Sequence, residues 1–413
     1  MQRSLLRQYR PRHTATAPLK FARSSFLPSP ELWRIFRSSL ATAVSVGWCC
    51  MQKVNVSLGE RSYSILIGKG LLPSLGSHYM RLGLGPRCAV ISDRKVAPRY
   101  AGVVLNSLKK VGVDPVLITV PSGEGTKSLR NLEFCYDQLA KHRLERKSSI
   151  LALGGGVVGD LAGFVAATYL RGIPFVQIPT TLLAQVDSSV GGKTGINLKA
   201  GKNLVGAFYQ PRLVICDLDT LDTLPLREFR AGLAEIIKYG IIQDAALFRL
   251  LEREMGMILK RDATLLTRII ARSCSIKADV VSQDETETSL RAILNFGHTV
   301  GHAIEASTGY GTYLHGEAIA IGQVLASILS IHLLDLPVAE AQRIAELFHA
   351  AGLPTSICLT PAKRTRLLHA MKLDKKVSGG EIKFVLAEKI GRVKWGQKVP
   401  LSLLNDVLTP YCG

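Results

Sequence analysis

The sequence has no Cys-x-x-Cys motif, no long uninterrupted apolar run and few aromatic residues. Its eight cysteines are scattered along 413 residues, which excludes a zinc ribbon and a thioredoxin motif. Free thiols in a reducing compartment are the simplest interpretation, and any bound metal must then be held by histidines and carboxylates. A run of about 18 apolar residues, as a membrane span requires, is missing. We therefore do not expect a membrane partner.

Acidic residues are scarce, because 32 Asp and Glu stand against 52 Lys and Arg, for a formal charge of +20. The basic residues are spread along the chain, and no basic run with interleaved aromatics favours nucleic-acid binding. A positive field would equally raise the local concentration of a small anionic substrate. We expect such a substrate as the partner, and no nucleic acid.

The length fits two domains after a short N-terminal extension. Residues 1–50 contain seven Arg, one Lys and a single acid, which resembles an organellar transit peptide. The alternative is that Met51 is the true start of a bacterial protein. The second interpretation predicts a cytoplasmic protein, and the first a plastid one. We exclude this extension from the fold.

Short apolar runs alternate with helical patterns in residues 51–225. The candidate strands are residues 63–67, 88–92, 116–120, 150–153, 175–178 and 213–216. Several are β-branched runs that end in Gly, Pro, Ser or Asp, which suits a parallel sheet buried on both faces, with ligands at the carboxyl ends of its strands. We predict an α/β fold with a Rossmann-like N-terminal domain.

The pattern changes to helical spacing in residues 226–413. The expected helices are residues 227–257, 260–282, 297–308, 315–335, 338–351 and 361–371, and a late hairpin is expected at 382–387 and 392–395. We therefore predict a mainly α-helical C-terminal domain, with the active site in the cleft between the domains.

A glycine-rich turn follows the candidate strand at 150–153. Glycines there let the backbone approach a pyrophosphate, and the next helix offers its N-terminal N–H groups. The spacing of Gly154, Gly156 and Gly159 matches the dinucleotide fingerprint, but the acid expected about 20 residues later is missing. We expect a variant arrangement that uses the loop 121–127. The alternative is a tight turn without a ligand.

A second glycine-rich segment contains Gly191, Gly192 and Lys193. It fails as a P-loop, because the first glycine of that motif would fall on Asp187. With further polar residues nearby, this segment could instead form an anion-binding loop. Those residues are Lys199, Lys202 and Asn203.

A possible metal site lies in the C-terminal half. His298 and His302 are spaced i, i+4 on one helix face, and His315 follows. Glu235 lies in an otherwise apolar helix, where a carboxylate is costly to bury unless it is paired or bound to a metal. Such a set describes a catalytic zinc site with an open position. Spacing alone makes both His298 and His302 ligands, and ordinary hydrogen-bonded histidines are the alternative.

Several long motifs in a fixed order resemble the 3-dehydroquinate synthases of the shikimate pathway. They are residues 154–160, 179–195, 201–204, 290–298 and 314–317, within a resemblance that spans residues 52–405. The resemblance implies zinc (or cobalt) bound by Glu235, His298 and His315, and it makes His302 an acid–base residue rather than a ligand.

The same resemblance implies further site residues. Those that grip the substrate are Lys193, Lys202, Asn203, Lys277, Arg291, Asn295 and one or both of Lys375 and Lys376. Asp187 and Glu287 match acidic active-site positions, and Arg171 matches one that reaches across a homodimer interface. The implied NAD-binding residues are Glu124, Lys127, Gly155, Gly156, Asp160, Thr180, Thr181, Lys193, Lys202, Thr220 and Thr223. Ser289 replaces a usual glycine, which could shift the loop of Glu287.

The implied activity converts 3-deoxy-D-arabino-heptulosonate 7-phosphate to 3-dehydroquinate and phosphate, with NAD regenerated in each cycle. Alternatives are a related sugar-phosphate cyclase that makes an inosose or valiolone, a metal-dependent polyol dehydrogenase, and an inactive binding protein. Lys277, Arg291 and Asn295 favour a substrate with a carboxylate.

Overall fold

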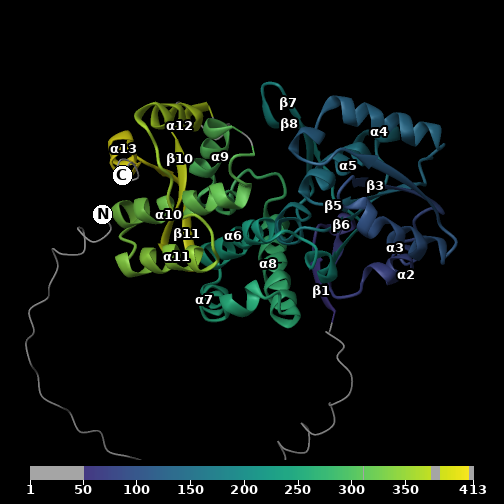
Figure 1. The fold of residues 1–413 in the computed structure, drawn as a ribbon, viewed down its shortest axis with the longest axis horizontal. Coiled ribbons are helices and arrows are strands. Elements are labelled where there is room, and N and C mark those ends of the chain that lie inside the picture. Colours follow the sequence, from purple (N-terminus) through teal and green to yellow (C-terminus); the bar gives the residue numbers. More distant parts are fainter. Residues whose placement is uncertain (1–50, 310, 374–381, 409–413) are drawn as a thin grey trace, which may run out of the picture. The chain divides into compact units, whose positions relative to one another are not determined.

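The computed structural model describes residues 51–309, 311–373 and 382–408. The extension predicted at residues 1–50 lies outside the described residues, as do Lys375 and Lys376. The described residues belong to one compact unit, in which the two predicted domains are a sheet half and a helical half (Figure 1). Pro225 immediately precedes the first long helix of the helical half, at the predicted boundary.

The sheet half is built on a seven-stranded sheet. Its strands are β1 (Gln52–Val56), β2 (Tyr63–Gly68), β3 (Arg87–Asp93), β4 (Asp114–Val120), β5 (Ser149–Gly154), β6 (Phe175–Pro179) and β9 (Leu213–Asp217). Their order is β1-β2-β9-β6-β5-β3-β4, and every neighbouring pair is parallel except β1 with β2. All residues of β5, β6 and β9 are buried, which explains their continuous apolar runs. The six predicted strands are confirmed.

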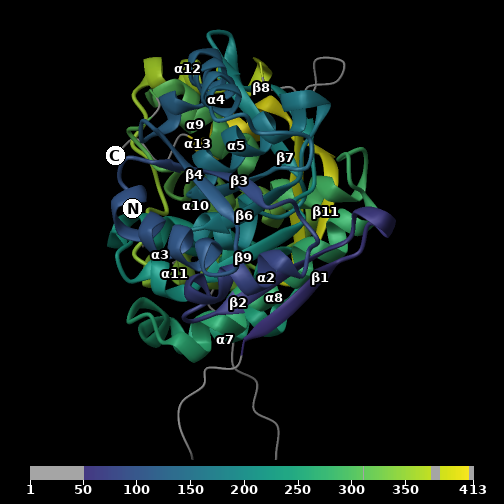
Figure 2. The same ribbon diagram turned by 90° about the vertical axis from the view of Figure 1, so that its right-hand side faces the viewer.

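Helices cover both faces of this sheet (Figures 1 and 2). They are α2 (Leu75–Met80), α3 (Ala97–Lys109), α4 (Leu129–Lys141) and α5 (Gly156–Thr168). Alternate residues of β3 point to opposite faces, so that Ile91 packs in the core with α4 and α5 while Val90 packs with α2 and α3.

The strand order reverses between β3 and β5, which are neighbours in the sheet. From β3 the chain continues to β4 at one edge of the sheet, whereas from β5 it continues to β6, toward the other edge. Ligands of open α/β sheets bind at the carboxyl ends of the strands beside such a reversal. Gly154 ends β5, so the glycine-rich turn lies at the position where a dinucleotide is expected.

A hairpin that the sequence did not predict follows β6. It pairs β7 (Lys193–Leu198) with β8 (Gly201–Phe208) in antiparallel register. No residue of β8 is buried, so β8 lacks the apolar alternation that would have marked it as a strand. Gly206 is required for the pairing, because a Cβ there would lie 2.0 Å from the Thr194 carbonyl oxygen. The expected anion-binding loop is thus two strands and their turn.

The second half is mainly helical, as predicted. Its helices are α6 (Leu226–Ile242), α7 (Ala245–Leu259), α8 (Ala263–Gln283), α9 (His298–Thr308), α10 (His315–Leu334), α11 (Val338–Ala350), α12 (Pro361–Leu373) and α13 (Leu401–Leu408). The predicted late hairpin is β10 (Lys383–Lys389) with β11 (Arg392–Lys398). The single helix predicted at 227–257 is wrong: Asp244 accepts hydrogen bonds from two backbone N–H groups and starts α7 there.

Short helical turns connect these elements. They are η2 (Gly59–Arg61), η3 (Leu72–Ser74), η4 (Glu124–Thr126), η5 (Tyr169–Arg171), η7 (Leu218–Leu221) and η8 (Leu290–Asn295), and η6 (Ala184–Ser188) is a π-helical turn. π-helical turns are rare and frequently lie at functional sites, and η6 carries Asp187.

Helices α6, α9 and α10 pack backbone to backbone through glycines. A Cβ on Gly316 would lie 1.9 Å from the Ala231 carbonyl oxygen, so α10 touches α6 at its first turn. A Cβ on Gly322 would lie 2.1 Å from the Gly297 carbonyl oxygen, just before α9. These contacts bring together the three helices that carry the predicted metal ligands.

Helix α10 is the one described helix that is long and apolar enough to cross a membrane, with a mean hydropathy of 1.7. However, 67% of that stretch is buried inside the protein. It packs against α6, α9 and α11, so its apolar composition is that of a core helix.

Candidate active site

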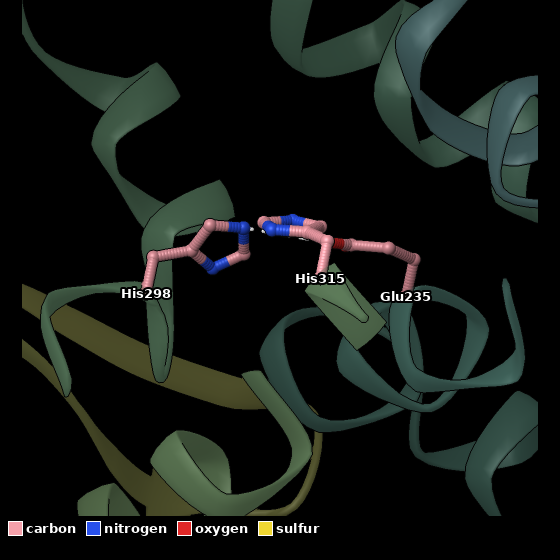
Figure 3. A group of neighbouring side chains, drawn as sticks. All are labelled: Glu235, His298 and His315. Carbon is pink, nitrogen blue, oxygen red and sulfur yellow. Dashed lines mark ion pairs between the residues drawn. The ribbon is translucent and has the colours of Figure 1, made fainter. Parts of the chain in front are cut away.

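The three predicted metal ligands converge in the helical half (Figure 3). Glu235 lies on α6, while His298 and His315 are the first residues of α9 and α10. Oε1 of Glu235 lies 3.3 Å from Nε2 of His298 and 3.6 Å from Nε2 of His315. One ligand atom from each residue lies within 4.8 Å of the others, which is close enough to share one ion.

Hydrogen bonds orient both imidazoles. Nδ1 of His298 lies 3.1 Å from the Phe296 carbonyl oxygen, so Nδ1 carries the proton and Nε2 presents its lone pair to Glu235. Burial lowers the pKa of His298 to about 4, against the attraction of Glu235. Burial also lowers the pKa of His315, but hydrogen bonds with Glu235 and Glu305 outweigh it and raise the pKa to about 10.

Glu235 is a carboxylate that lacks ordinary partners. It is fully buried, and neither of its oxygens has a hydrogen-bond partner of normal geometry among the described residues. Burial raises its pKa, but the Lys238 ammonium, which pairs with Oε2, and His298 outweigh burial and hold the pKa well below its usual range. One ionised carboxylate oxygen with two imidazole nitrogens is a zinc donor set, so these residues fit a divalent metal.

A second group of possible ligands shares His315. It consists of His302, Glu305 and His315, again with ligand atoms within 4.8 Å of one another. Among the described residues, neither group contains both His298 and His302, whose rings lie edge to face with centroids 5.3 Å apart. The pair of ligands suggested by i, i+4 spacing is therefore absent from both groups.

Asp187, which is partly exposed, and the buried Lys277 form an ion pair beside the metal ligands. Oδ1 of Asp187 accepts hydrogen bonds from Nζ of Lys277 at 2.6 Å and from the Tyr239 hydroxyl at 2.9 Å. Burial raises the pKa of Asp187, but Lys277 outweighs it and the pKa falls to about 2. Burial lowers the pKa of Lys277 to about 8. Nζ of Lys238 lies 3.9 Å from Asp187 and so links this pair to Glu235.

Glu287 joins the hairpin to the loop before α9. Its Oε1 accepts a hydrogen bond from Nδ2 of Asn295 at 2.7 Å, and its Oε2 pairs with Nζ of Lys193. Ser289 donates its N–H to Asp284 at 2.8 Å with a negative φ, so no left-handed conformation calls for glycine there. The departure at Ser289 leaves Glu287 beside the other predicted residues.

Arg291 is 1% exposed, and its guanidinium anchors a loop. It donates hydrogen bonds to the Glu285 carbonyl oxygen and, at 3.1 Å, to the Gly191 carbonyl oxygen. This observed role is structural, and direct contact of Arg291 with substrate stays a prediction.

The predicted NAD residues gather at the N-terminus of α5. A Cβ on Gly155 would lie 3.1 Å from Cγ2 of Thr181, so a side chain at this turn would crowd its neighbour. Lys127 pairs with Asp160 at 2.7 Å. Burial lowers the pKa of Lys127, but Asp160 and Glu124 outweigh it and raise the pKa. With the strand reversal beside it, this turn fits a dinucleotide.

The remaining predicted residues lie on several elements of the sheet half. The N–H of Thr180 donates to the Gly154 carbonyl oxygen at 2.9 Å. Thr220 donates to the Asp217 carbonyl oxygen at 2.6 Å, and Thr223 shares a 2.6 Å hydrogen bond with Tyr100. Gly156 begins α5, and Asn203 has a φ of +52° next to Lys202 in β8. Arg171 is exposed at the end of η5, which follows the C-terminus of α5, so it lies at the opposite end of this helix from the glycine turn.

Sequence reasoning missed three residues. Lys238 follows Glu235 by one helical turn, and Glu305 follows His302 by one turn, so both could have been found by extending the i, i+3 pattern. The third, Asp93, ends β3 at the same edge of the sheet as the glycine turn after β5, and it accepts a hydrogen bond from Ser122 at 2.7 Å.

Known proteins are similar to this chain in both sequence and fold. Family models described as 3-dehydroquinate synthase N-terminal and C-terminal match residues 117–231 and 232–377. A 3-dehydroquinate synthase of Pelobacter propionicus is 56% identical over 342 residues, which is 83% of this chain and 94% of that protein. One of Geobacter metallireducens is 51% identical over 357 residues, which is 86% and 99% of the two.

Solved structures confirm the fold class. A 2-deoxy-scyllo-inosose synthase in complex with carbaglucose-6-phosphate, NAD+ and Co2+ matches with a TM-score of 0.80 at 26% identity, covering 87% of this chain and all of that one. The 2-epi-5-epi-valiolone synthase of Streptomyces hygroscopicus, with NAD+ and Zn2+ bound, matches with a TM-score of 0.76 at 28% identity, covering 86% and 98%. Together with the family models and the curated relatives, these matches show that the chain belongs to the 3-dehydroquinate synthase family and is an enzyme of that kind, a cyclising lyase.

Proposed function

We propose that this chain converts 3-deoxy-D-arabino-heptulosonate 7-phosphate to 3-dehydroquinate and phosphate, with NAD and one divalent metal, zinc or cobalt, as cofactors. The observation that carries the proposal is the convergence of Glu235, His298 and His315 beside a row of paired charges. In that row, Lys238 and Asp187 connect the metal ligands to Lys277. Relatives with this activity, at 50–56% identity, support the same assignment.

Different groups of residues would hold the two cofactors. When bound, the metal supplies Lewis acidity at a substrate hydroxyl, and NAD supplies a transient oxidation that is later reversed. Glu235, His298 and His315 would hold the metal, and the glycine turn at the start of α5 would hold the NAD pyrophosphate. His302 lies one helical turn after His298 and would move protons to and from the substrate.

The cationic side chains would bind the phosphate and the carboxylate of the substrate. Lys193 and Lys277 are each held by a carboxylate, Glu287 and Asp187 respectively, so their ammonium groups are positioned before substrate arrives. Cations fixed in a partly buried site stabilise an anion more than mobile cations in water do, because little reorganisation is needed. Lys202, Asn203 and Asn295 would complete the substrate contacts.

Two related activities remain as alternatives. The matching solved structures are an inosose synthase and a valiolone synthase, but they are only 26% and 28% identical to this chain. The curated relatives at 50% identity and above are 3-dehydroquinate synthases, which favours the substrate with a carboxylate. A glycerol dehydrogenase at 16% identity shares the fold alone, and it offers no support for a polyol dehydrogenase.

One assay separates these activities. The purified protein is given the heptulosonate phosphate, zinc and a trace of NAD, and phosphate, dehydroquinate and NADH are followed together. We expect equal amounts of phosphate and dehydroquinate without net NADH, and no product after metal chelation. Net NADH would indicate a dehydrogenase, and turnover of a phosphosugar that lacks a carboxylate, with none of the heptulosonate, would indicate another cyclase.

We also propose a homodimer in the cytoplasm. Arg171 supports the dimer, since it is exposed at the end of η5 and is implied by the family resemblance to reach a second copy. Light scattering on the purified protein tests the assembly, and a monomer at assay concentrations would contradict it. Import into a plastid is the alternative location, and mass spectrometry of the native N-terminus decides whether residues 1–50 are removed.

A further inference from the structure

Glu305 lies between the two halves of the site, and the family resemblance gives it no role. It is 9% exposed on α9, and its two oxygens contact different partners. Oε2 lies 3.1 Å from Nδ1 of His315, and Oε1 lies 3.2 Å from Nζ of Lys202. Lys202 belongs to β8 in the sheet half, whereas His315 begins α10 in the helical half.

The other role open to Glu305 is that of a metal ligand in the group with His302 and His315. One observation weighs against it. Both oxygens of Glu305 have hydrogen-bond partners, Nδ1 of His315 and Nζ of Lys202, whereas neither oxygen of Glu235 has a partner of normal geometry among the described residues. An ion that takes Nε2 of His315 beside Glu235 leaves the Nδ1–H of His315 for Glu305.

We propose that Glu305 is a positioning residue: it accepts a hydrogen bond from Nδ1–H of His315, which directs Nε2 toward Glu235, and it ties this ligand to Lys202 on the β7–β8 hairpin. The arrangement is the one by which an outer carboxylate fixes the tautomer and orientation of a metal-binding imidazole. The inference rests on the proposed metal site and deepens it, because it names what holds one ligand and connects that ligand to the other half of the site.

Metal binding tests the proposal without turnover. Zinc affinity is measured by competition with a chromogenic chelator for the wild type, Glu305→Ala and Glu305→Gln, with the absorption spectrum of the Co2+ forms. We expect Glu305→Ala to lower the affinity roughly 10–100-fold and to alter the Co2+ spectrum. Glu305→Gln keeps an oxygen that accepts the Nδ1–H, so it should recover most of the affinity. All three proteins should bind one equivalent at saturation.

The control is Glu252→Gln, which breaks an exposed ion pair with Arg343 and should leave zinc affinity unchanged. Unchanged affinity in Glu305→Ala would overturn the positioning role. Two equivalents in the wild type and one in Glu305→Ala would make Glu305 a ligand and would overturn it as well. None of these results depends on the substrate, so failure here leaves the proposed reaction standing.

The tie to the hairpin needs its own measurement. A glutamine at position 305 cannot form the ion pair with Lys202, so backbone amides of β8 should exchange hydrogen faster in Glu305→Gln. Lys202→Met removes the same ion pair from the other side and should have the same effect on β8. If β8 exchanges at the wild-type rate in both variants, Glu305 positions His315 but does not hold the hairpin, and that part of the inference is wrong.

Discussion

The nucleotide side and the metal side of this site are built in opposite ways. On the nucleotide side, the turn between β5 and α5 is one contiguous run whose glycines keep side chains away. On the metal side, Glu235, His298 and His315 come from three different helices and meet only because glycines let those helices touch. A site made of backbone is therefore encoded locally, whereas a site made of side chains depends on distant packing.

The two sides also handle charge differently. Around the glycine turn, Lys127 pairs with Asp160 and Glu124, both of which are partly exposed. Around the metal ligands, charges form a chain from Glu235 through Lys238 and Asp187 to Lys277, in which Glu235 and Lys238 are almost fully buried. Because removing one member of a buried pair leaves the other uncompensated, substitutions in the Glu235–Lys238 pair should have the larger consequences.

The largest effect should follow from removing a ligand. His315→Ala should lose metal and activity together, by more than the roughly 10–100-fold that loss of an outer-shell partner costs. Metal content by mass spectrometry and the phosphate-release assay check this result. His332→Ala, an exposed position on the same helix, is the matched control and should behave as the wild type. A fully metallated, active His315→Ala would refute the ligand assignment.

The next effect separates chemistry from metal binding. His302→Ala should reduce kcat by roughly 10²–10⁴-fold, the usual contribution of an acid–base group, and keep its zinc. The readouts are kcat at saturating substrate and the metal content of the same sample. Loss of zinc would instead restore the interpretation, drawn from i, i+4 spacing, that His302 is a ligand.

A third change tests whether glycine packing assembles the metal side. Gly316→Ala would place a Cβ 1.9 Å from the Ala231 carbonyl oxygen and force α10 away from α6. Overpacking of this kind costs about 1–3 kcal/mol, and zinc affinity should fall with stability. Gly256→Ala in α7 meets no atom within 4 Å and should be neutral or slightly stabilising. Denaturant unfolding measures the stability of both variants. Equal stability of Gly316→Ala and Gly256→Ala would contradict this account.

The smallest effect concerns pH. Burial lowers the pKa of Lys277 to about 8, so its ammonium is lost as pH rises through 8, although a lysine in water stays charged to about pH 10.4. If this charge binds the substrate anion, kcat/KM should decline above pH 8. Arginine stays charged, so the kcat/KM of Lys277→Arg, whatever its level, should not decline between pH 8 and pH 10. A wild-type profile that is flat to pH 10 would show that the charge on Lys277 is not needed.

Sequence predicted the sheet well and the hairpin not at all. The strands β5, β6 and β9 are short apolar runs with every residue buried, and such runs are recognisable without tertiary information. The hairpin strand β8 has no buried residue, so only its pairing with β7 defines it. Likewise, the boundary between α6 and α7 depends on one capping residue, Asp244, within a continuous helical pattern.

The candidate site shows the same division. Glu235 was recognisable as an acid in an apolar helix, but its partner Lys238 was not singled out, since lysine is ordinary in helices. Glu305 is recognisable as a site residue only from its contacts with His315 and Lys202, which lie on other elements. Spacing along one helix paired His298 with His302, and it could not reveal that each ring lies in a different group of possible ligands.

The most direct measurement is anomalous diffraction at the zinc edge from crystals of the zinc-loaded protein. We predict one peak, within bonding distance of Glu235, His298 and His315, with Glu305 hydrogen-bonded to His315 from outside. A peak coordinated by His302, Glu305 and His315, or no peak near either group, would contradict the assignment on which the proposed chemistry depends.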